Sequence, residues 1–266
     1  MLRWWLTNCV GGTASMNIKN GWVVPLLMVG CATSPVSGTN EQNARASNGP
    51  WSEIPAVEMT AEETSIPIGL LRDVASALLK RAGAKVCDPS TRRPIVGLSM
   101  EYCSTVYVAG EGDSLSWRVT EPVDGGFDSC RPSSDVKDAD YPASQVWVVG
   151  YVHNHPCAAT PSSKDLTQWP TDAFDPYVSM AEVRMIPGNP TPVIHQNKAI
   201  EMASALVAER QDGTRLFLRY FTTGEVQQWS EAKSQWILLD RCIPRQANPF
   251  TSMPQCSHGP LRLLRE

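Results

Sequence analysis

The sequence predicts a single domain of the α+β or α/β class, with a mixed central β-sheet flanked by helices. One indication is a set of apolar residues at helical spacing in residues 70–79, followed by the helix-ending Gly83. A second is a series of short runs of β-branched and aromatic residues separated by turn-forming segments. The third is size, because 266 residues, 42% of them hydrophobic, suit one domain with a sizeable core.

The expected elements follow from these patterns. The helix over 70–79 faces the core, a helix begins at Ser162, and a second long helix is expected over 199–210. Residues 110–113 form the turn of a hairpin, and the last three strands form an antiparallel meander. Strands are expected at 95–100, 104–109, 115–120, 145–152, 216–221, 225–229 and 236–239.

The N-terminal segment resembles a bacterial lipoprotein signal peptide. Its apolar run, residues 21–30, is shorter than the ~20 residues that a membrane-spanning helix needs, and Cys31 follows directly. Residues 28–31 resemble a lipobox, in which the cysteine sulfur is lipidated before cleavage. Met16 precedes a better leader than Met1 does, so we expect residues 1–15 not to be translated. The alternative is a buried strand with a free cysteine.

This interpretation predicts four segments. Residues 1–30 are the signal peptide, and 31–67, rich in Ser, Thr, Asn, Glu and Pro, are the lipidated cysteine and a flexible tether. Residues 68–242 form the domain, and 243–266 form an irregular tail. With alanine rather than aspartate after Cys31, we expect an exported protein anchored by lipid in the outer rather than the inner membrane.

Cysteine number and charge narrow the class of protein. Of the eight cysteines, Cys9 would be removed and Cys31 lipidated. An even six in an exported protein predict at least two disulfides, with 15 pairings open. The net charge of −4 provides no basic field for nucleic acid, so no nucleic-acid partner is expected. The six candidate disulfide cysteines are Cys87, Cys103, Cys130, Cys157, Cys242 and Cys256.

A candidate metal site lies at the end of the longest expected strand. His153 and His155 are two residues apart, so in an extended chain their side chains share a face and can converge on one ion. Ser162 and Asp165 share a face of the first turn of the helix that follows. Asp165 can thus add an oxygen to two nitrogens, and three protein ligands are typical of catalytic zinc. Each part alone is also typical of ordinary surface histidines and helix caps.

The order His-x-His-Pro and then Ser-x-x-Asp, after a hydrophobic strand, resembles the signature of the JAMM (MPN+) zinc metallopeptidases. The form HNHP…PSSKD is similar to the bacterial branch of that superfamily. Residues 117–123 also resemble a T-x-P hairpin pattern of a JAB-like group, domain of unknown function 4329. The resemblance covers roughly residues 70–169, and it implies a JAB/MPN-type fold related to that of cytidine deaminases.

The resemblance implies a mechanism as well. His153, His155 and Asp165 would bind one Zn²⁺ per chain, and Glu101, on an early strand, would be the general base for a metal-activated water. Ser162 would donate a hydrogen bond to the oxyanion. The implied activity is that of a metallopeptidase or isopeptidase that hydrolyses an amide bond of a peptide or protein outside the cytoplasm.

Some alternatives remain open at this point. Glu121 is the second choice for the base, and Cys157 could bind the metal or form a disulfide. The spacing from His155 to Ser162 is about one residue shorter than in related sequences. The chain could instead be a non-catalytic lipoprotein that uses such a fold for binding. A zinc deaminase is disfavoured, because His-x-Glu and the second cysteine of Pro-Cys-x-x-Cys are missing.

Overall fold

The chain divides into two units, Met1–Asn40 and Glu41–Glu266. The computed structural model describes residues 46–60, 63–112, 114–133, 135–158, 160–167, 194–195, 198–243 and 254–265, all within the second unit. The expected signal peptide and the lipidation site Cys31 lie outside the described residues. No helix among the described residues is long and apolar enough to cross a membrane.

The described residues form mostly strands. The helices are α1 (Ile68–Leu78), α2 (Ser163–Thr167) and the single-turn 3-10 helix η1 (Ala143–Gln145). The strands up to the candidate site are β1 (Ser47–Gly49), β2 (Val57–Glu58), β3 (Tyr102–Glu111), β4 (Ser114–Val119), β5 (Val123–Asp124), β6 (Val136–Asp138) and β7 (Val146–Asn154). The later strands are β8 (Ile194–His195), β9 (Lys198–Ala199), β10 (Ala203–Glu209), β11 (Arg215–Phe221), β12 (Glu225–Ser230), β13 (Gln235–Ile243) and β14 (Gln255–Cys256).

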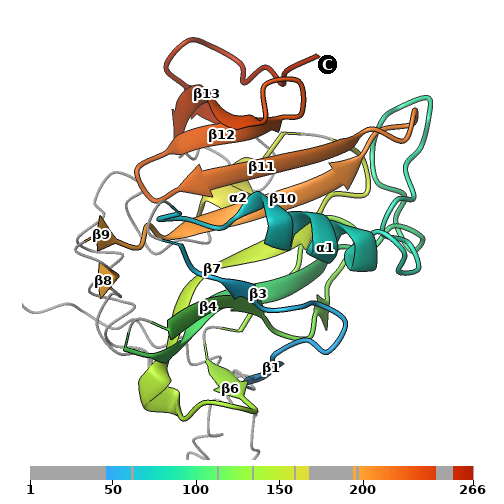
Figure 1. Cartoon of the computed structure of the whole chain (residues 1–266). Coiled ribbons are helices and arrows are strands. Elements are labelled where there is room, and N and C mark those ends of the chain that lie inside the picture. Colours follow the sequence, from blue (N-terminus) through green and yellow to red (C-terminus); the bar gives the residue numbers. More distant parts are fainter. Residues whose placement is uncertain are drawn as a thin grey trace, which may run out of the picture. The chain divides into compact units, whose positions relative to one another are not determined.

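One ten-stranded mixed sheet dominates the domain (Figure 1). Its strand order is β14-β13-β12-β11-β10-β7-β3-β4-β2, with β5 paired to the start of β3. Within this sheet, all pairs are antiparallel except β7 with β10, which is parallel. Strand β7, which carries His153 and ends directly before His155, therefore lies in the interior of the sheet, bonded on both sides. Two small separate sheets pair β1 with β6 and β8 with β9.

The two faces of the sheet carry different cores. Helix α1 packs on one face and buries Leu70, Leu71 and Val74 in a cluster that includes Val152 of β7. On the other face, Tyr151 packs with Leu166 of α2 and with residues of β10 and β11. Tyr151 and Val152 are neighbours in sequence, so they point to opposite faces, as the pleat of a strand requires. His153 belongs with Tyr151, on the face that α2 contacts.

The expected helix-flanked α+β or α/β domain of JAB/MPN type is wrong. The described residues contain two α-helices, of 11 and 5 residues, beside fourteen strands. The helix expected over 199–210 is the strand β10, which lies between β7 and β11. Residues 203–208 are all buried, because both faces of this inner strand are covered. A continuous apolar run of this kind is compatible with either a buried strand or a helix.

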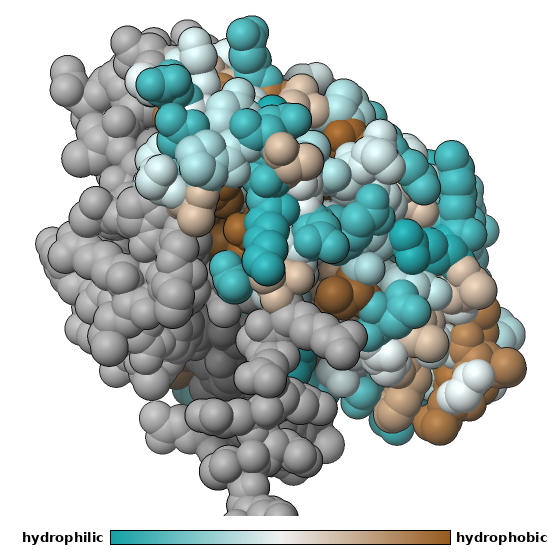
Figure 2. Space-filling view, turned by 90° about the horizontal axis from the view of Figure 1, so that it is seen from below, coloured by the Kyte–Doolittle hydropathy of each residue, from teal (hydrophilic) through white to brown (hydrophobic). Residues whose placement is uncertain are grey.

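The strand expected at 95–100 is also wrong. This segment forms a turn in which the Leu98 amide donates to the Ile95 carbonyl, and Gly97 has a φ of +79°. Val96 and Leu98 are 72% and 63% exposed, so the apolar run does not belong to the core. Figure 2 shows a face on which hydrophilic residues dominate and apolar residues gather mainly near one edge. Scattered exposed apolar residues are ordinary on protein surfaces.

The described parts of the expected tether and tail are packed against the domain. Strand β1 pairs with β6, β2 pairs with β4, and Trp51 between them is 1% exposed. In this part the chain differs from the flexible linker expected, because Trp51 belongs to the main core. The tail forms the short strand β14, and Leu261 is buried. The polar composition of residues 31–67 therefore did not predict where the packed domain begins.

The prediction of at least two disulfides is confirmed. The pairs are Cys87–Cys157, Cys103–Cys130 and Cys242–Cys256. The first pair excludes Cys157 as a metal ligand. Three disulfides indicate that the protein resides in an oxidising, extracellular type of compartment.

Replacing both Cys242 and Cys256 by alanine is expected to lower the free energy of unfolding by about 3 kcal/mol. The pair closes a loop with a sequence separation of 14, and the disulfide limits the conformations of the unfolded chain. Urea unfolding of the oxidised wild type and the double variant measures the difference. Equal unfolding free energies would show that this disulfide does not stabilise the domain.

Candidate metal centre

Register places the two histidines on one face of the sheet. His153 lies in β7 opposite Cys103 of β3 on one side and beside Leu206 of β10 on the other. The His155 amide donates to the Val207 carbonyl at 3.1 Å, which continues the strand path beyond β7. His153 and His155 therefore point the same way, and their ring centroids are 4.9 Å apart. The alternation expected from the sequence is confirmed.

Helix α2 brings the aspartate to the histidines. The main-chain amide and the hydroxyl of Ser162 both donate to Oδ2 of Asp165, at 2.6 and 2.8 Å. The Asp165 amide donates back to the Ser162 hydroxyl at 3.2 Å. This reciprocal pattern is that of a capping box, and it fixes both the start of the helix and the direction of the carboxylate. The oxyanion role expected of Ser162 stays a prediction, since its hydroxyl here donates to Asp165.

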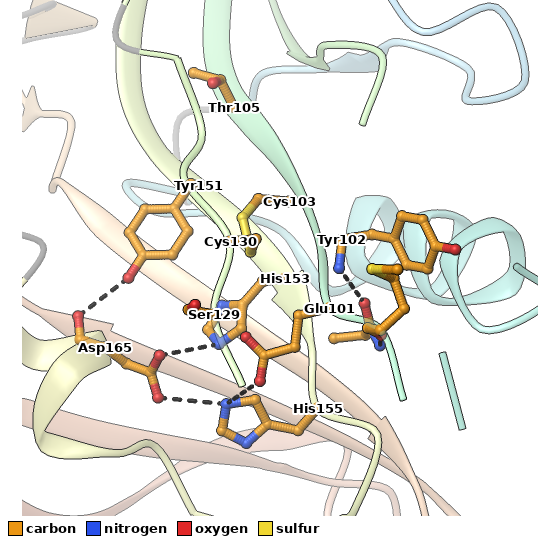
Figure 3. The surroundings of a disulfide bond; sticks show 12 residues. Glu101, Tyr102, Cys103, Thr105, Ser129, Cys130, Tyr151, His153, His155 and Asp165 are labelled. Carbon is orange, nitrogen blue, oxygen red and sulfur yellow. Dashed lines mark hydrogen bonds and ion pairs between the residues drawn. A yellow bond between two sulfur atoms is a disulfide. The ribbon is translucent and has the colours of Figure 1, made fainter. Parts of the chain in front are cut away.

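The three side chains converge in a buried cluster (Figure 3). Nε2 of His153 lies 3.4 Å from Oδ1 of Asp165, and Nε2 of His155 lies 3.3 Å from Oδ2. The three ligand atoms are within 4.8 Å of one another, and all three residues are buried. This cluster can hold a metal ion.

Electrostatics and hydrogen bonding fit a cation at this position. Burial disfavours the charge of Asp165, but the two imidazoles outweigh it and hold the pKa of Asp165 well below its usual range. Both ring nitrogens of His153 are buried and lack a hydrogen-bond partner among the described residues. A buried polar atom without a partner costs about 1–3 kcal/mol. A metal ion bound to Nε2 would remove that cost for one of the two nitrogens.

Glu101 lies beside the cluster because of strand pairing. Cys103 is opposite His153 in the antiparallel β3–β7 pair, so continuing this register by two residues sets Glu101 opposite His155. Oε1 of Glu101 is 3.9 Å from Nε2 of His155, and the residue is 5% exposed (Figure 3). Burial raises the pKa of Glu101 to about 7, and a bound cation would lower it again.

The second choice for the base, Glu121, lies elsewhere, as do two residues of similar chemistry, Glu111 and His258. Glu121 is exposed, and its amide donates to the Asn48 carbonyl next to the small β1–β6 sheet. Glu111, at the end of β3, is exposed as well. His258 is paired with Asp240, Nδ1 to Oδ1 at 3.0 Å, and the side chain of His195 is outside the described part of the chain. Of the two bases considered, Glu101 is the one beside the histidines.

Sequence reasoning missed a set of residues that support the cluster. The Tyr151 hydroxyl donates to the Asp165 carbonyl at 3.1 Å and lies 2.6 Å from the Tyr220 hydroxyl. Burial raises the pKa of both tyrosines, so both stay neutral donors. Tyr151 could have been found, since it is two residues before His153 and must share its face. Nothing in the sequence indicates Tyr220, which β11 brings from a distance.

Comparison of the chain with models of known protein families and with curated proteins found no match. The likeness to the JAMM signature therefore rests on the residues themselves.

Proposed function

We propose that this protein is a zinc-dependent hydrolase of peptide or isopeptide amide bonds that acts outside the cytoplasm. The observation that carries the proposal is the position of Glu101 beside the buried cluster of His153, His155 and Asp165. Two nitrogens and one oxygen suit zinc, and three protein ligands leave the open position that catalytic zinc needs. The order of these residues resembles the JAMM signature, and the proposal concerns this site rather than the fold.

The side chains have separate roles in the proposed reaction. Zn²⁺ bound by His153, His155 and Asp165 would supply Lewis-acid chemistry, lowering the pKa of a water and polarising the scissile carbonyl. Glu101 accepts the proton of the attacking water and returns it to the leaving amine. Ser162 keeps the carboxylate of Asp165 turned toward the histidines. The Tyr151 hydroxyl holds the main chain of Asp165 from the other side.

A peptide-library cleavage screen tests this function. Zinc-loaded, disulfide-intact protein should generate new N-termini that mass spectrometry detects, and a chelator should stop the reaction until zinc is restored. The matched control is His153→Ala/His155→Ala, which should be inactive. Cleavage that persists in the control, or in chelator-treated protein, would contradict a metal-dependent reaction at this site.

We also propose that the protein is attached to the bacterial membrane, preferably the outer one, by lipid on Cys31. The support is the short apolar run before Cys31 and the polar residues after it. Detergent phase separation should recover wild type in the detergent phase and Cys31→Ser in the aqueous phase. Equal partitioning of the two proteins would exclude this anchor.

A further inference from the structure

Asn154 lies between the two histidines but points to the other face of the sheet. It is 0% exposed, and its side chain makes three hydrogen bonds, all to main-chain groups. A buried amide side chain has two donor hydrogens and an acceptor oxygen to satisfy, and here each is used. The partners of these bonds show what Asn154 holds.

Two of the three partners flank Glu101 directly. Oδ1 of Asn154 accepts from the Tyr102 amide at 2.8 Å, and Nδ2 donates to the Met100 carbonyl at 3.1 Å. The third bond, from Nδ2 to the Ala84 carbonyl at 2.8 Å, joins the segment that follows α1. One side chain thus connects the histidine-bearing strand to the main chain on both sides of Glu101.

This connection replaces ordinary strand pairing where such pairing stops. The β3–β7 register runs only as far as Cys103 and His153, so Glu101 lies beyond it. On its other side, Glu101 exchanges two main-chain hydrogen bonds, its amide to the Gly126 carbonyl at 2.7 Å and the Gly125 amide to its carbonyl at 2.9 Å. Without Asn154, the segment would keep these two bonds and the bond from the Met100 amide to the Gly83 carbonyl at 3.0 Å, but it would lose its hydrogen bonds to β7.

We infer that Asn154 is a positioning residue, which fixes the distance between Glu101 and the histidines. This inference rests on the proposed function, since it assigns Asn154 a task in placing the general base. Aspartate at this position would turn an acceptor toward the Met100 and Ala84 carbonyls, and alanine would leave the Tyr102 amide without its bond. A displacement of about 1 Å can cost about 10²-fold in rate.

Asn154→Ala in the zinc-loaded, disulfide-intact protein tests the inference through three readouts. The Tyr102 amide should exchange its hydrogen at least about ten-fold faster than in wild type, the zinc content should stay the same, and kcat should fall about 10²-fold with little change in KM. The matched control is Ser104→Ala, which also truncates a fully buried polar residue. Ser104 lies opposite Val152, and the Ser104 hydroxyl has no hydrogen-bond partner in the described structure. It should leave kcat and Tyr102 exchange unchanged.

Several outcomes would overturn the inference. Full kcat in Asn154→Ala with a freed Tyr102 amide would show that Glu101 does not depend on Asn154. If Asn154→Ala fails to fold, hydrogen exchange of the wild type tests the inference. A Tyr102 amide that exchanges as fast as exposed loop amides cannot be bonded to Asn154, and this result would overturn the inference. Failure of the proposed function is distinct from these results, since wild type would then lack zinc or hydrolysis while its Tyr102 amide could still be protected.

Discussion

Glu101→Gln is expected to lower the rate of hydrolysis by about 10²–10⁴-fold while the zinc content stays unchanged. Glutamine keeps the size and the hydrogen-bonding capacity of the side chain but cannot take a proton from water. Glu101 is not one of the three clustered ligands, so the metal should remain bound. Steady-state kinetics on any peptide that the wild type cleaves, together with elemental analysis, measures both quantities.

The matched control for this change is Glu121→Gln. Glu121 is exposed and anchored through its amide to Asn48, away from the histidines, so this variant should keep wild-type activity. Full activity in Glu101→Gln would remove Glu101 from the mechanism. Loss of activity in Glu121→Gln, with full activity in Glu101→Gln, would identify Glu121 as the base.

Removal of the metal is expected to destabilise the domain. A ligand that binds only the folded state stabilises it by about 4 kcal/mol at a free concentration 1,000 times its Kd. The cluster joins β7 to α2, and without a cation neither ring nitrogen of the buried His153 makes a hydrogen bond within the described structure. Denaturant unfolding with zinc at such an excess, and again with a chelator, measures the difference.

The control for metal-linked stability is His153→Ala/His155→Ala. Its unfolding free energy should be the same with zinc and with chelator, because the two nitrogen ligands are gone. A zinc-dependent gain of the wild-type size in this variant would place the metal elsewhere on the chain. The comparison is made within each protein, so any intrinsic destabilisation by the substitutions does not affect it.

The local pattern was sufficient to predict the strands that build the site. The apolar run of β7 and the turn before β4 are properties of a few adjacent residues, and these strands were predicted within a few positions. The sheet order was not predictable, because β10 reads as a continuous apolar run and shows no period of two. That strand was expected as a helix, and it is the parallel neighbour of β7. This one error therefore changed both the expected helix content and the expected sheet order.

The site shows the same division between local and distant information. His153, His155 and Asp165 were predicted from spacing, and the structure brings the three together. Glu101 was expected near them only from the resemblance, because its position depends on the β3–β7 register, which spacing along the chain does not contain. Asn154 was overlooked because its partners lie about 50 to 70 residues earlier in the sequence.

Zinc stoichiometry tests the proposed centre most directly. Elemental analysis of disulfide-intact protein, after incubation with zinc and removal of the excess, should find one zinc per chain in wild type and in Glu101→Gln. The same analysis should find none in His153→Ala/His155→Ala. Zinc retained at one per chain in that double variant, or absent from wild type, would contradict a metal centre formed by His153, His155 and Asp165.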